Sequence, residues 1–532
     1  MNVNDRQPYH GAKRRLVLAF DLGTTFSGIS YAVLDPGQVP KISTVSRYPG
    51  QEAGDSKIQT VIYYDANGRV VATGAEEPPT GDGDEDDDWE DVQPQKLEWF
   101  KLILRPRQTA SSNKNIPTPK LPPSKDIVDV YADFYRYLFA RARDYIRQTH
   151  ASGDSLWNSV AGDIDFVLSH PNGWDGAQQN AMRRAAVKAG LVPDTPSGRE
   201  RVTFVSEGEA SFHYCVSSGR VADAIKTGNN VMVIDAGGGT IDLSTYTFAE
   251  ASPITIKEIA APGCIFEGSV IVRKRAEQHL VTRLGTSKFS GKAYIDSMVE
   301  EFDKNTKKRF KPGVGDSYVK FSNMTTDRDM KFGIRNGQIK LTKEEVSGFF
   351  DPGVEEIILA IKDQQAATHM PVSTYFLVGG FAASEYLYSK LNTFLGGQGS
   401  TRTRPSQKGT QVSETTTFMR YFYYLSHHGT NSISCTVAGY RGSRKETPLW
   451  RDEDPAGFSD LCTISGDVSR VPKVLRLGPG GETFYRQDYY VVLSFGLTEF
   501  KAHLEWEQGG VRHRGPASVI YEDDFVVTVS DD

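Results

Sequence analysis

Two stretches of the chain have the same order of apolar and polar positions. In the first, the apolar residues 16–20 precede Asp21, a glycine, two threonines and a second apolar run. In the second, the apolar residues 231–234 precede Asp235, three consecutive glycines, a threonine and residues 241–244, where apolar and polar side chains alternate. Short apolar runs predict buried strands, and alternation with a period of two predicts a strand that returns beside them. Each stretch therefore predicts a β-hairpin with a glycine-containing turn.

The turns of these two hairpins suit an anionic ligand. Glycine lets backbone N–H groups approach a ligand closely, and successive amides in a turn form a nest for anionic oxygens. Each pattern alone also fits an ordinary hairpin, but the two copies, far apart in the chain, indicate duplicated halves that hold one nucleotide from both sides. Asp21 and Asp235 would then meet near the phosphates. Mg²⁺ suits such a place because it takes one or two carboxylates, phosphate oxygens and several waters.

These residues resemble the phosphate motifs of the actin-like ATPase superfamily, and within it those of the 70-kDa heat-shock chaperone family. The motifs are Asp-Leu-Gly-Thr-Thr at 21–25 and Asp-Ala-Gly-Gly-Gly-Thr-Ile-Asp at 235–242. A third stretch, 374–384, is similar to the family's adenosine motif, in which an apolar strand ends in two glycines and a helix follows, here with Ser384 as its N-cap. The sequence at 379–387 is similar to the divergent type-12 branch. The resemblance implies a duplicated, two-lobed actin-like (ribonuclease-H-like) α/β fold that binds ATP or ADP with Mg²⁺.

The resemblance also assigns roles to single residues. Asp21, Asp235 and Glu207 match the positions that hold Mg²⁺ through its waters. Lys101 and Thr240 match positions that orient the attacking water and stabilise charge on the transferred phosphoryl group, so these five residues form the expected catalytic set. From the residues alone, Lys101 also fits a surface lysine, and Glu207 fits an acid at a helix N-terminus.

Further positions would contact the nucleotide. They lie in the two phosphate turns, in a glycine turn, in a basic helix segment and in the adenosine motif: Gly23, Thr24, Thr25, Phe26, Gly237, Gly238, Gly239, Thr240, Gly268, Lys307, Lys308, Gly379, Gly380 and Phe381. For the two lysines, a solvated basic helix face explains the sequence nearly as well.

The chain departs from the family pattern in two places. Gly208 and Glu209 replace the family's Pro and Thr, which predicts a flexible turn where the family has a rigid one. Near the C-terminal end the family's leucine-rich linker has no counterpart, and the alternating residues 500–506 predict strands. The domains expected are a flexible tail, an actin-like nucleotide-binding domain that contains a mobile acidic loop, and a β-rich, truncated substrate-type domain without a helical lid: 1–13, 14–425 with the loop at 76–94, and 426–532.

Composition excludes other classes of protein. The net charge is −6, and the eight acids between residues 82 and 91 account for the excess, so nothing indicates nucleic acid binding. The four cysteines are scattered without metal-like spacing, which favours a reducing compartment. No apolar run approaches the roughly 20 residues of a membrane span. We expect a cytoplasmic or nuclear protein without a membrane partner.

Three functions remain open at this point. The first is a chaperone-like, stress-related ATPase in which hydrolysis opens and closes the nucleotide cleft, with an unfolded polypeptide or a co-chaperone as partner. The second is a nucleotide-binding scaffold with little or no hydrolysis, which the altered residues Gly208 and Glu209 and the missing linker favour. The third is a small-molecule kinase of the same superfamily, although no residues mark an acceptor pocket.

Overall fold

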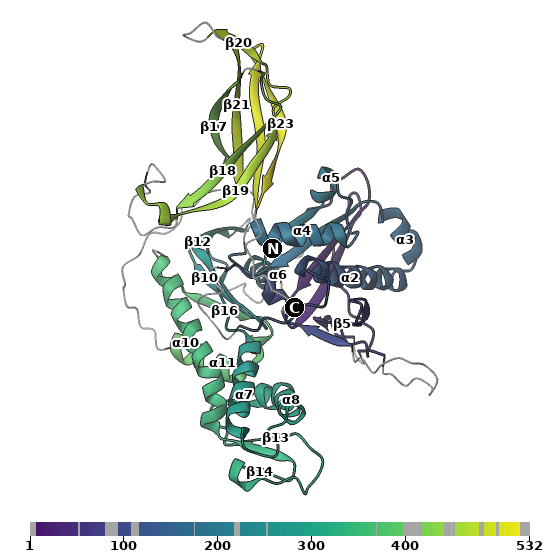
Figure 1. Cartoon of the computed structure of the whole chain (residues 1–532), viewed down its shortest axis with the longest axis vertical. Coiled ribbons are helices and arrows are strands. Elements are labelled where there is room, and N and C mark those ends of the chain that lie inside the picture. Colours follow the sequence, from purple (N-terminus) through teal and green to yellow (C-terminus); the bar gives the residue numbers. More distant parts are fainter. Residues whose placement is uncertain are drawn as a thin grey trace. The chain divides into compact units, whose positions relative to one another are not determined.

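The structure is a computed structural model of the 532-residue chain. Residues are described over the following ranges: 7–51, 54–79, 94–107, 116–174, 176–217, 224–251, 254–368, 370–396, 417–426, 428–440, 448, 453–477, 483–495 and 499–521. Internal contacts divide the chain into two compact units, which comprise residues 1–173, 183–406 and 526–532, and residues 174–182 and 407–525. Figure 1 labels the elements of both units.

The first unit contains a six-stranded sheet in which β1 is central. The strand order is β3-β2-β1-β8-β9, and β4 also pairs with β2. β1 and β2 form an antiparallel hairpin, whereas β8 runs parallel to both β1 and β9. The strands are β1 (Arg15–Leu22), β2 (Phe26–Leu34), β3 (Ile42–Thr44), β4 (Lys57–Gln59), β8 (Ile164–His170) and β9 (Val202–Ser206). Every second residue of β1 is buried because successive side chains of a strand point to opposite faces.

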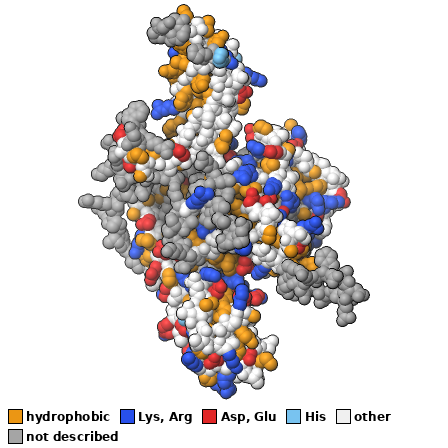
Figure 2. Space-filling view, viewed as in Figure 1, with side chains coloured by type: hydrophobic (Ala, Val, Ile, Leu, Met, Phe, Trp, Pro, Cys, Tyr) orange, Lys and Arg blue, Asp and Glu red, His pale blue; other side chains and the backbone are white. Residues whose placement is uncertain are grey.

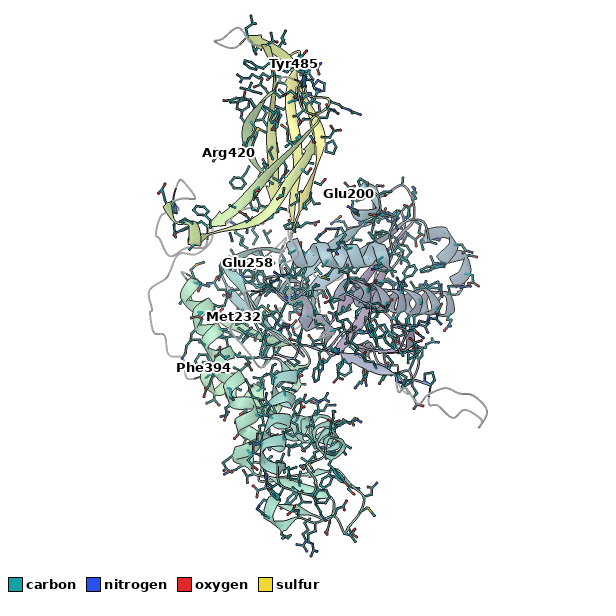
Figure 3. All side chains as sticks on the ribbon, in the orientation of Figure 1. Glu200, Met232, Glu258, Phe394, Arg420 and Tyr485 are labelled. Carbon is teal, nitrogen blue, oxygen red and sulfur yellow. The ribbon has the colours of Figure 1, made fainter. Side chains whose placement is uncertain are left out.

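A second, four-stranded sheet of this unit has the order β12-β11-β10-β16. β10 and β11 form an antiparallel hairpin, and β16 runs parallel to β10. The strands are β10 (Asn230–Ala236), β11 (Ile241–Ala251), β12 (Ile254–Ile265) and β16 (Thr374–Val378). Met232 of β10, labelled in Figure 3, belongs to the core that this sheet shares with α7 (Ser269–Leu284) and α10 (Lys343–Ala367).

Both predicted hairpins are therefore confirmed. In each sheet, the first strand of the hairpin pairs in parallel with a strand from later in the chain. The first unit is a mixed α/β structure with several sheets, consistent with an actin-like two-lobed fold.

Helices and small sheets complete the first unit. The helices are α2 (Ile127–Thr149), α3 (Gly153–Val160), α4 (Gly176–Lys188), α5 (Pro196–Arg199), α6 (Glu207–Ser217), α8 (Lys292–Glu301), α9 (Lys307–Arg309), α11 (Glu385–Gly396) and the short helices η2 (Phe100–Leu104), η4 (Phe302–Thr306), η5 (Met330–Phe332) and η6 (Phe381–Ala383), with α4 divided between the units. The small sheets are β6-β5-β7 and β13-β15-β14, formed by β5 (Val61–Tyr64), β6 (Val70–Thr73), β7 (Gln95–Glu98), β13 (Ser317–Lys320), β14 (Ile334–Arg335) and β15 (Gln338–Leu341).

The second unit is built on a seven-stranded antiparallel sheet. Its order is β17-β21-β22-β23-β19-β18, with β20 beside β21. The elements are β17 (Thr417–Ser426), β18 (Ser432–Tyr440), β19 (Phe458–Asp467), β20 (Val474–Leu477), β21 (Thr483–Phe495), β22 (Phe500–Gln508), β23 (Val511–Ile520) and the short helix η8 (Pro455–Gly457). The predicted strand over 500–506 is confirmed as β22, which buries Leu504 and Trp506.

Two details of the expected domain limits need correction. The boundary at residue 425 would leave β17 in the first domain, but β17 pairs along its length with β21 and belongs to the C-terminal sheet. The tail 1–13 is fixed at Tyr9, whose N–H donates to the Gln38 carbonyl at 2.8 Å. Residues 1–6 and 80–93, which include most of the acidic loop, lie outside the described residues. Among the residues that are described, no helix is long and apolar enough to cross a membrane.

Candidate functional site

The turns of the two hairpins lie against each other. A Cβ atom built on Gly238 would lie 2.3 Å from the Thr25 Oγ1, and one built on Gly239 would lie 2.4 Å from the Thr24 Oγ1. Real Cβ atoms do not approach heavy atoms this closely, so the contact requires glycine at both positions. Two segments that share a sequence pattern thus come together, as expected for halves that hold one ligand.

The second turn is held by the start of α7. The N–H groups of Gly268, Ser269 and Val270 donate to the carbonyls of residues 239, 237 and 238 at 3.3, 3.2 and 2.9 Å. A Cβ on Gly268 would lie 2.4 Å from the Gly238 carbonyl oxygen, so this predicted residue also lies at the turn. These bonds orient the turn's carbonyl groups towards α7.

Three amides of the same turn have no acceptor in the part of the chain that the structure describes. The Gly237 N–H donates to the Thr240 carbonyl at 2.9 Å, which closes the turn. The next three N–H groups, those of Gly238, Gly239 and Thr240, donate to no backbone or side-chain acceptor among the described residues. Free neighbouring amides at a glycine turn form a nest for anionic oxygens.

A buried ion pair lies beside the turns. Lys101 in η2 has a side chain that is only 3% exposed, and its Nζ donates to the Glu207 Oε1 at 2.5 Å. Glu207 is the first residue of α6. Burial disfavours the charged lysine, but Glu207, with Asp21 and Asp242, outweighs this effect and raises the pKa of Lys101. Lys101 is therefore a buried cation and not the surface lysine that the residues alone also allowed.

Asp21, near the end of β1, has a partner for each carboxylate oxygen. The Ser169 Oγ donates to its Oδ1 at 2.9 Å, and the Lys57 Nζ forms an ion pair with its Oδ2. Desolvation tends to raise the pKa of Asp21, but the charges of Lys57 and Lys101 outweigh it and lower this pKa. The group is therefore a carboxylate at neutral pH.

Asp235, near the end of β10, is a buried acid with a hydroxyl partner. The Ser211 hydroxyl of α6 donates to its Oδ2. Burial, followed in effect by the negative charges of Glu207 and Asp21, raises the pKa of Asp235 to about 6. Gly379 lies beside it with a φ of +90°, and a Cβ there would lie 2.4 Å from the Asp235 Oδ1. The adenosine motif therefore reaches the second phosphate motif, because β16 pairs with β10.

A further buried acid, Asp242, was in the motif but was not assigned a role. The Asn172 N–H donates to its Oδ1 at 2.5 Å, and its Oδ2 receives no N–H or O–H bond from the described residues. Burial, with the charges of Glu207 and Asp235, raises its pKa well above the usual value. The raised pKa favours the neutral acid, which can donate its O–H to a neighbouring group.

These residues fit Mg²⁺ held mainly through water. Four carboxyl groups (Asp21, Glu207, Asp235 and Asp242) lie in the site with two lysines, and burial together with their mutual repulsion raises the pKa of Glu207, Asp235 and Asp242. In the described part of the chain, no three His, Cys, Asp or Glu side chains are close enough to cage a metal directly. Mg²⁺ keeps several waters and takes phosphate oxygens in such sites, so it needs no direct cage.

The remaining predicted residues are distributed unevenly. The Lys307 Nζ pairs with Asp303 and donates to the Ser269 carbonyl at 3.4 Å, at the start of α7. Lys308 is exposed, and Phe26 is 51% exposed. Phe381 is buried with its ring centroid 6.2 Å from that of Phe350, so only its backbone can face a nucleotide. The predicted cap of α11 is confirmed, since the Ser384 Oγ accepts from the Leu387 N–H at 3.4 Å.

Gly208 does not form the flexible turn that the sequence predicted. It lies in the first turn of α6. A Cβ there would lie 2.2 Å from the Ser244 Oγ and 3.0 Å from the Asn172 Nδ2. The position is tightly packed, so glycine is required by space and not by flexibility. The packing partners come from β11 and from the segment after β8, which sequence spacing alone does not reveal.

The sequence patterns did not predict the buried acid Asp242 or the polar partners of Asp21, Asp235 and Asp242. These partners are Lys57, Ser169, Ser211 and Asn172. Asp242 could have been chosen because it ends the second motif, whereas nothing in the local sequence marks the others.

The chain has distant similarity to known proteins. No protein-family model matches the chain. The chain is similar to Heat shock 70 kDa protein 12A of Mus musculus, with 22% identity over 477 residues that cover 74% of this chain and 68% of the relative. For human Heat shock 70 kDa protein 12A the identity is 22%, with 75% and 67% covered, and for human 12B it is 22%, with 72% and 65% covered. The chain is a divergent relative of the type-12 70-kDa heat-shock proteins.

Proposed function

We propose that the chain binds Mg·ATP at its two glycine turns and hydrolyses it, as a chaperone-like ATPase of the 70-kDa heat-shock type. The observation that carries the proposal is the contact of Gly238 and Gly239 with Thr25 and Thr24, next to three amides without partners. This arrangement supports phosphate binding from two sides. The similarity to Heat shock 70 kDa proteins 12A and 12B supports the choice of ATP among nucleotides.

In the proposed mechanism each residue of the site positions or neutralises charge. The amides of residues 23–25 and 237–240 hold phosphate oxygens, and Asp21, Asp235 and Glu207 accept hydrogen bonds from the waters of the metal. Mg²⁺, when bound, neutralises charge that develops on the phosphates. Lys101 supplies a buried positive charge, which is worth more in a low-dielectric site than in water. With Thr240 it orients the attacking water.

The wider function follows from the same proposal. We interpret the two hairpin sheets as duplicated halves that close on nucleotide and open after hydrolysis. Gly268, Lys307, Lys308 and the backbone of 379–381 would hold the nucleoside side. The C-terminal sheet would act as a truncated substrate domain for an unfolded polypeptide or a co-chaperone, in the cytoplasm or nucleus.

Nucleotide binding can be tested by substituting one glycine of the turn. Gly238→Ala pushes a methyl group into Thr25. Gly315→Ala is a matched control because a Cβ there meets no atom of the described residues within 4 Å. Calorimetric titration with Mg·ATP should give an affinity about tenfold lower or worse for Gly238→Ala and an unchanged affinity for Gly315→Ala, with melting temperatures confirming that both fold. Equal affinity of parent and Gly238→Ala would refute binding at the turns.

A nucleotide-binding scaffold with little hydrolysis is the second candidate. The packing of Gly208 against Ser244 and Asn172 favours it, because no room exists for the proline through which the resembled family links its domains. Tight binding of Mg·ATP without release of phosphate would support this candidate over the ATPase.

A further inference from the structure

Three residues on neighbouring strands form a row across the first sheet. Asp21 of β1 lies opposite Gly28 of β2, and Gly28 lies opposite Lys57 of β4. Residues that are directly opposite in neighbouring strands project from the same face of a sheet. Lys57 and Asp21 therefore share one face, and the Lys57 ammonium group forms an ion pair with the Asp21 carboxylate across β2, the strand between them.

Gly28 provides the path for this side chain. A Cβ built on Gly28 would lie 3.1 Å from the Lys57 Cδ and 3.3 Å from both its Cε and its Nζ. The end of the lysine therefore passes directly over the glycine. Outer strands of such a row are about 10 Å apart, which an extended lysine and an aspartate span together only if nothing stands between them.

The ion pair itself contributes little to folding. The side chains of Lys57 and Asp21 are 46% and 47% exposed. Ion pairs with this degree of exposure typically contribute about 0–1 kcal/mol because water screens them. Stability therefore does not explain a lysine that is brought over an intervening strand to an acid of the phosphate site.

The two lysines of the site differ in their freedom. Lys101 is buried and fixed by Glu207, whereas Lys57 is half-exposed at the end of a flexible chain. A flexible lysine can leave a carboxylate for a nearby phosphate oxygen without leaving a buried charge unpaired. Asp21 is also one of the acids proposed to face the waters of Mg²⁺, so arrival of the metal would release Lys57 at the place where phosphates bind.

We propose that Lys57 is a second phosphate-binding residue, which neutralises Asp21 when the site is empty and transfers to a phosphate oxygen when Mg·nucleotide binds. The inference rests on the proposed nucleotide function. It adds Lys57 to the phosphate-binding residues and states that this lysine moves from Asp21 to a phosphate oxygen. Because the contact is to phosphate and not to the nucleoside, removal of Lys57 should weaken the binding of ATP and ADP but leave the binding of adenosine unchanged.

The test compares Lys57→Met with a lysine of equal exposure. Lys96 pairs with Glu98 and is 47% exposed, so Lys96→Met removes a similar surface ion pair away from the turns. Calorimetry on the full chain with Mg·ATP, Mg·ADP and adenosine should show about tenfold weaker binding of both nucleotides to Lys57→Met. Adenosine binding should be unchanged, Lys57→Arg should restore most of the affinity, and Lys96→Met should behave as the parent.

A second variant tests the path. Gly28→Val leaves both charges in place but blocks the passage of Lys57, and it should lower nucleotide affinity as Lys57→Met does, with no further loss in the double variant. If the parent binds nucleotide and Lys57→Met binds it equally well, the role of Lys57 is overturned and the ATP-binding proposal stands. Equal weakening of adenosine binding and nucleotide binding in Lys57→Met would also overturn the role of Lys57. If the parent binds neither nucleotide, both proposals fall.

Discussion

Lys101 and Glu207 are 106 positions apart in the sequence, yet the lysine Nζ lies 2.5 Å from the glutamate Oε1. The pair joins η2 to the start of α6 next to both glycine turns. Desolvation of two charges often offsets their attraction, so a buried pair is weak support for stability. Its position favours a role in charge stabilisation at the phosphates.

Substitution of both partners separates the structural role of this pair from its role in turnover. Lys101→Met leaves the Glu207 carboxylate buried without its counter-ion and should lower the free energy of unfolding by about 3 kcal/mol. The double variant Lys101→Met/Glu207→Gln carries neither charge and should regain most of that stability. Both variants should lose ATP turnover. Urea unfolding and phosphate release measure the two effects, and an active double variant would exclude a catalytic role.

The raised pKa of Asp235 predicts a dependence of stability on pH. Its pKa is about 6 in the folded chain against 3.8 in the reference state, so the folded protein binds an extra proton between these values. The contribution of this group is therefore favourable below pH 4 and is lost as the pH rises through about 6. At pH 7.5, Asp235→Asn should increase the free energy of unfolding by on the order of 2 kcal/mol.

The measurement is urea unfolding of the parent and of Asp235→Asn between pH 5 and pH 8. The two stability curves should converge towards low pH and separate above about pH 6. Parallel curves over this range would show that ionisation of Asp235 does not lower the free energy of unfolding, and would contradict the raised pKa. The same variant should bind Mg·ATP more weakly, because it lacks the carboxylate proposed to face the waters of Mg²⁺. Asp235 would then lower stability but serve binding, as residues of functional sites often do.

The edge strand β17 predicts self-association of the protein. Among the described residues its one strand partner is β21, and its apolar and aromatic side chains are exposed, from 38% for Phe422 to 55% for Tyr423. Hydrophobic side chains gather on this unit in Figure 2, and Figure 3 labels Arg420 on the strand. Exposed, apolar edge strands pair readily with other chains.

Tyr423→Lys should therefore reduce association, because a lysine on an edge opposes pairing. Tyr388→Lys is the matched control, since Tyr388 is 56% exposed but lies on the helix α11 and not on a strand. Light scattering over a concentration series should show less association for Tyr423→Lys and the parent's behaviour for Tyr388→Lys. Equal scattering of all three proteins would contradict a role for β17.

Sequence patterns predicted those parts of the molecule in which neighbours along the chain determine the structure. Both hairpins, β22 and the cap at Ser384 depend on alternation, glycine turns and capping, all of which are local. Lys57 was missed because its contact depends on the register of three strands, which local spacing does not encode. Gly208 was misinterpreted because its neighbours Ser244 and Asn172 come from other segments.

The assignment of β17 was wrong for a related reason. Its aromatic and apolar residues occupy both faces, so no alternation marked it as a strand, and its membership of the C-terminal sheet follows only from pairing with β21.

Phosphate release from Mg·ATP by the intact protein should be measured beside Asp235→Asn. The parent should turn ATP over, and the variant should lose that turnover while its chain remains folded. Absence of turnover in the parent, with Mg·ATP bound at saturation, would contradict the ATPase and leave the nucleotide-binding scaffold.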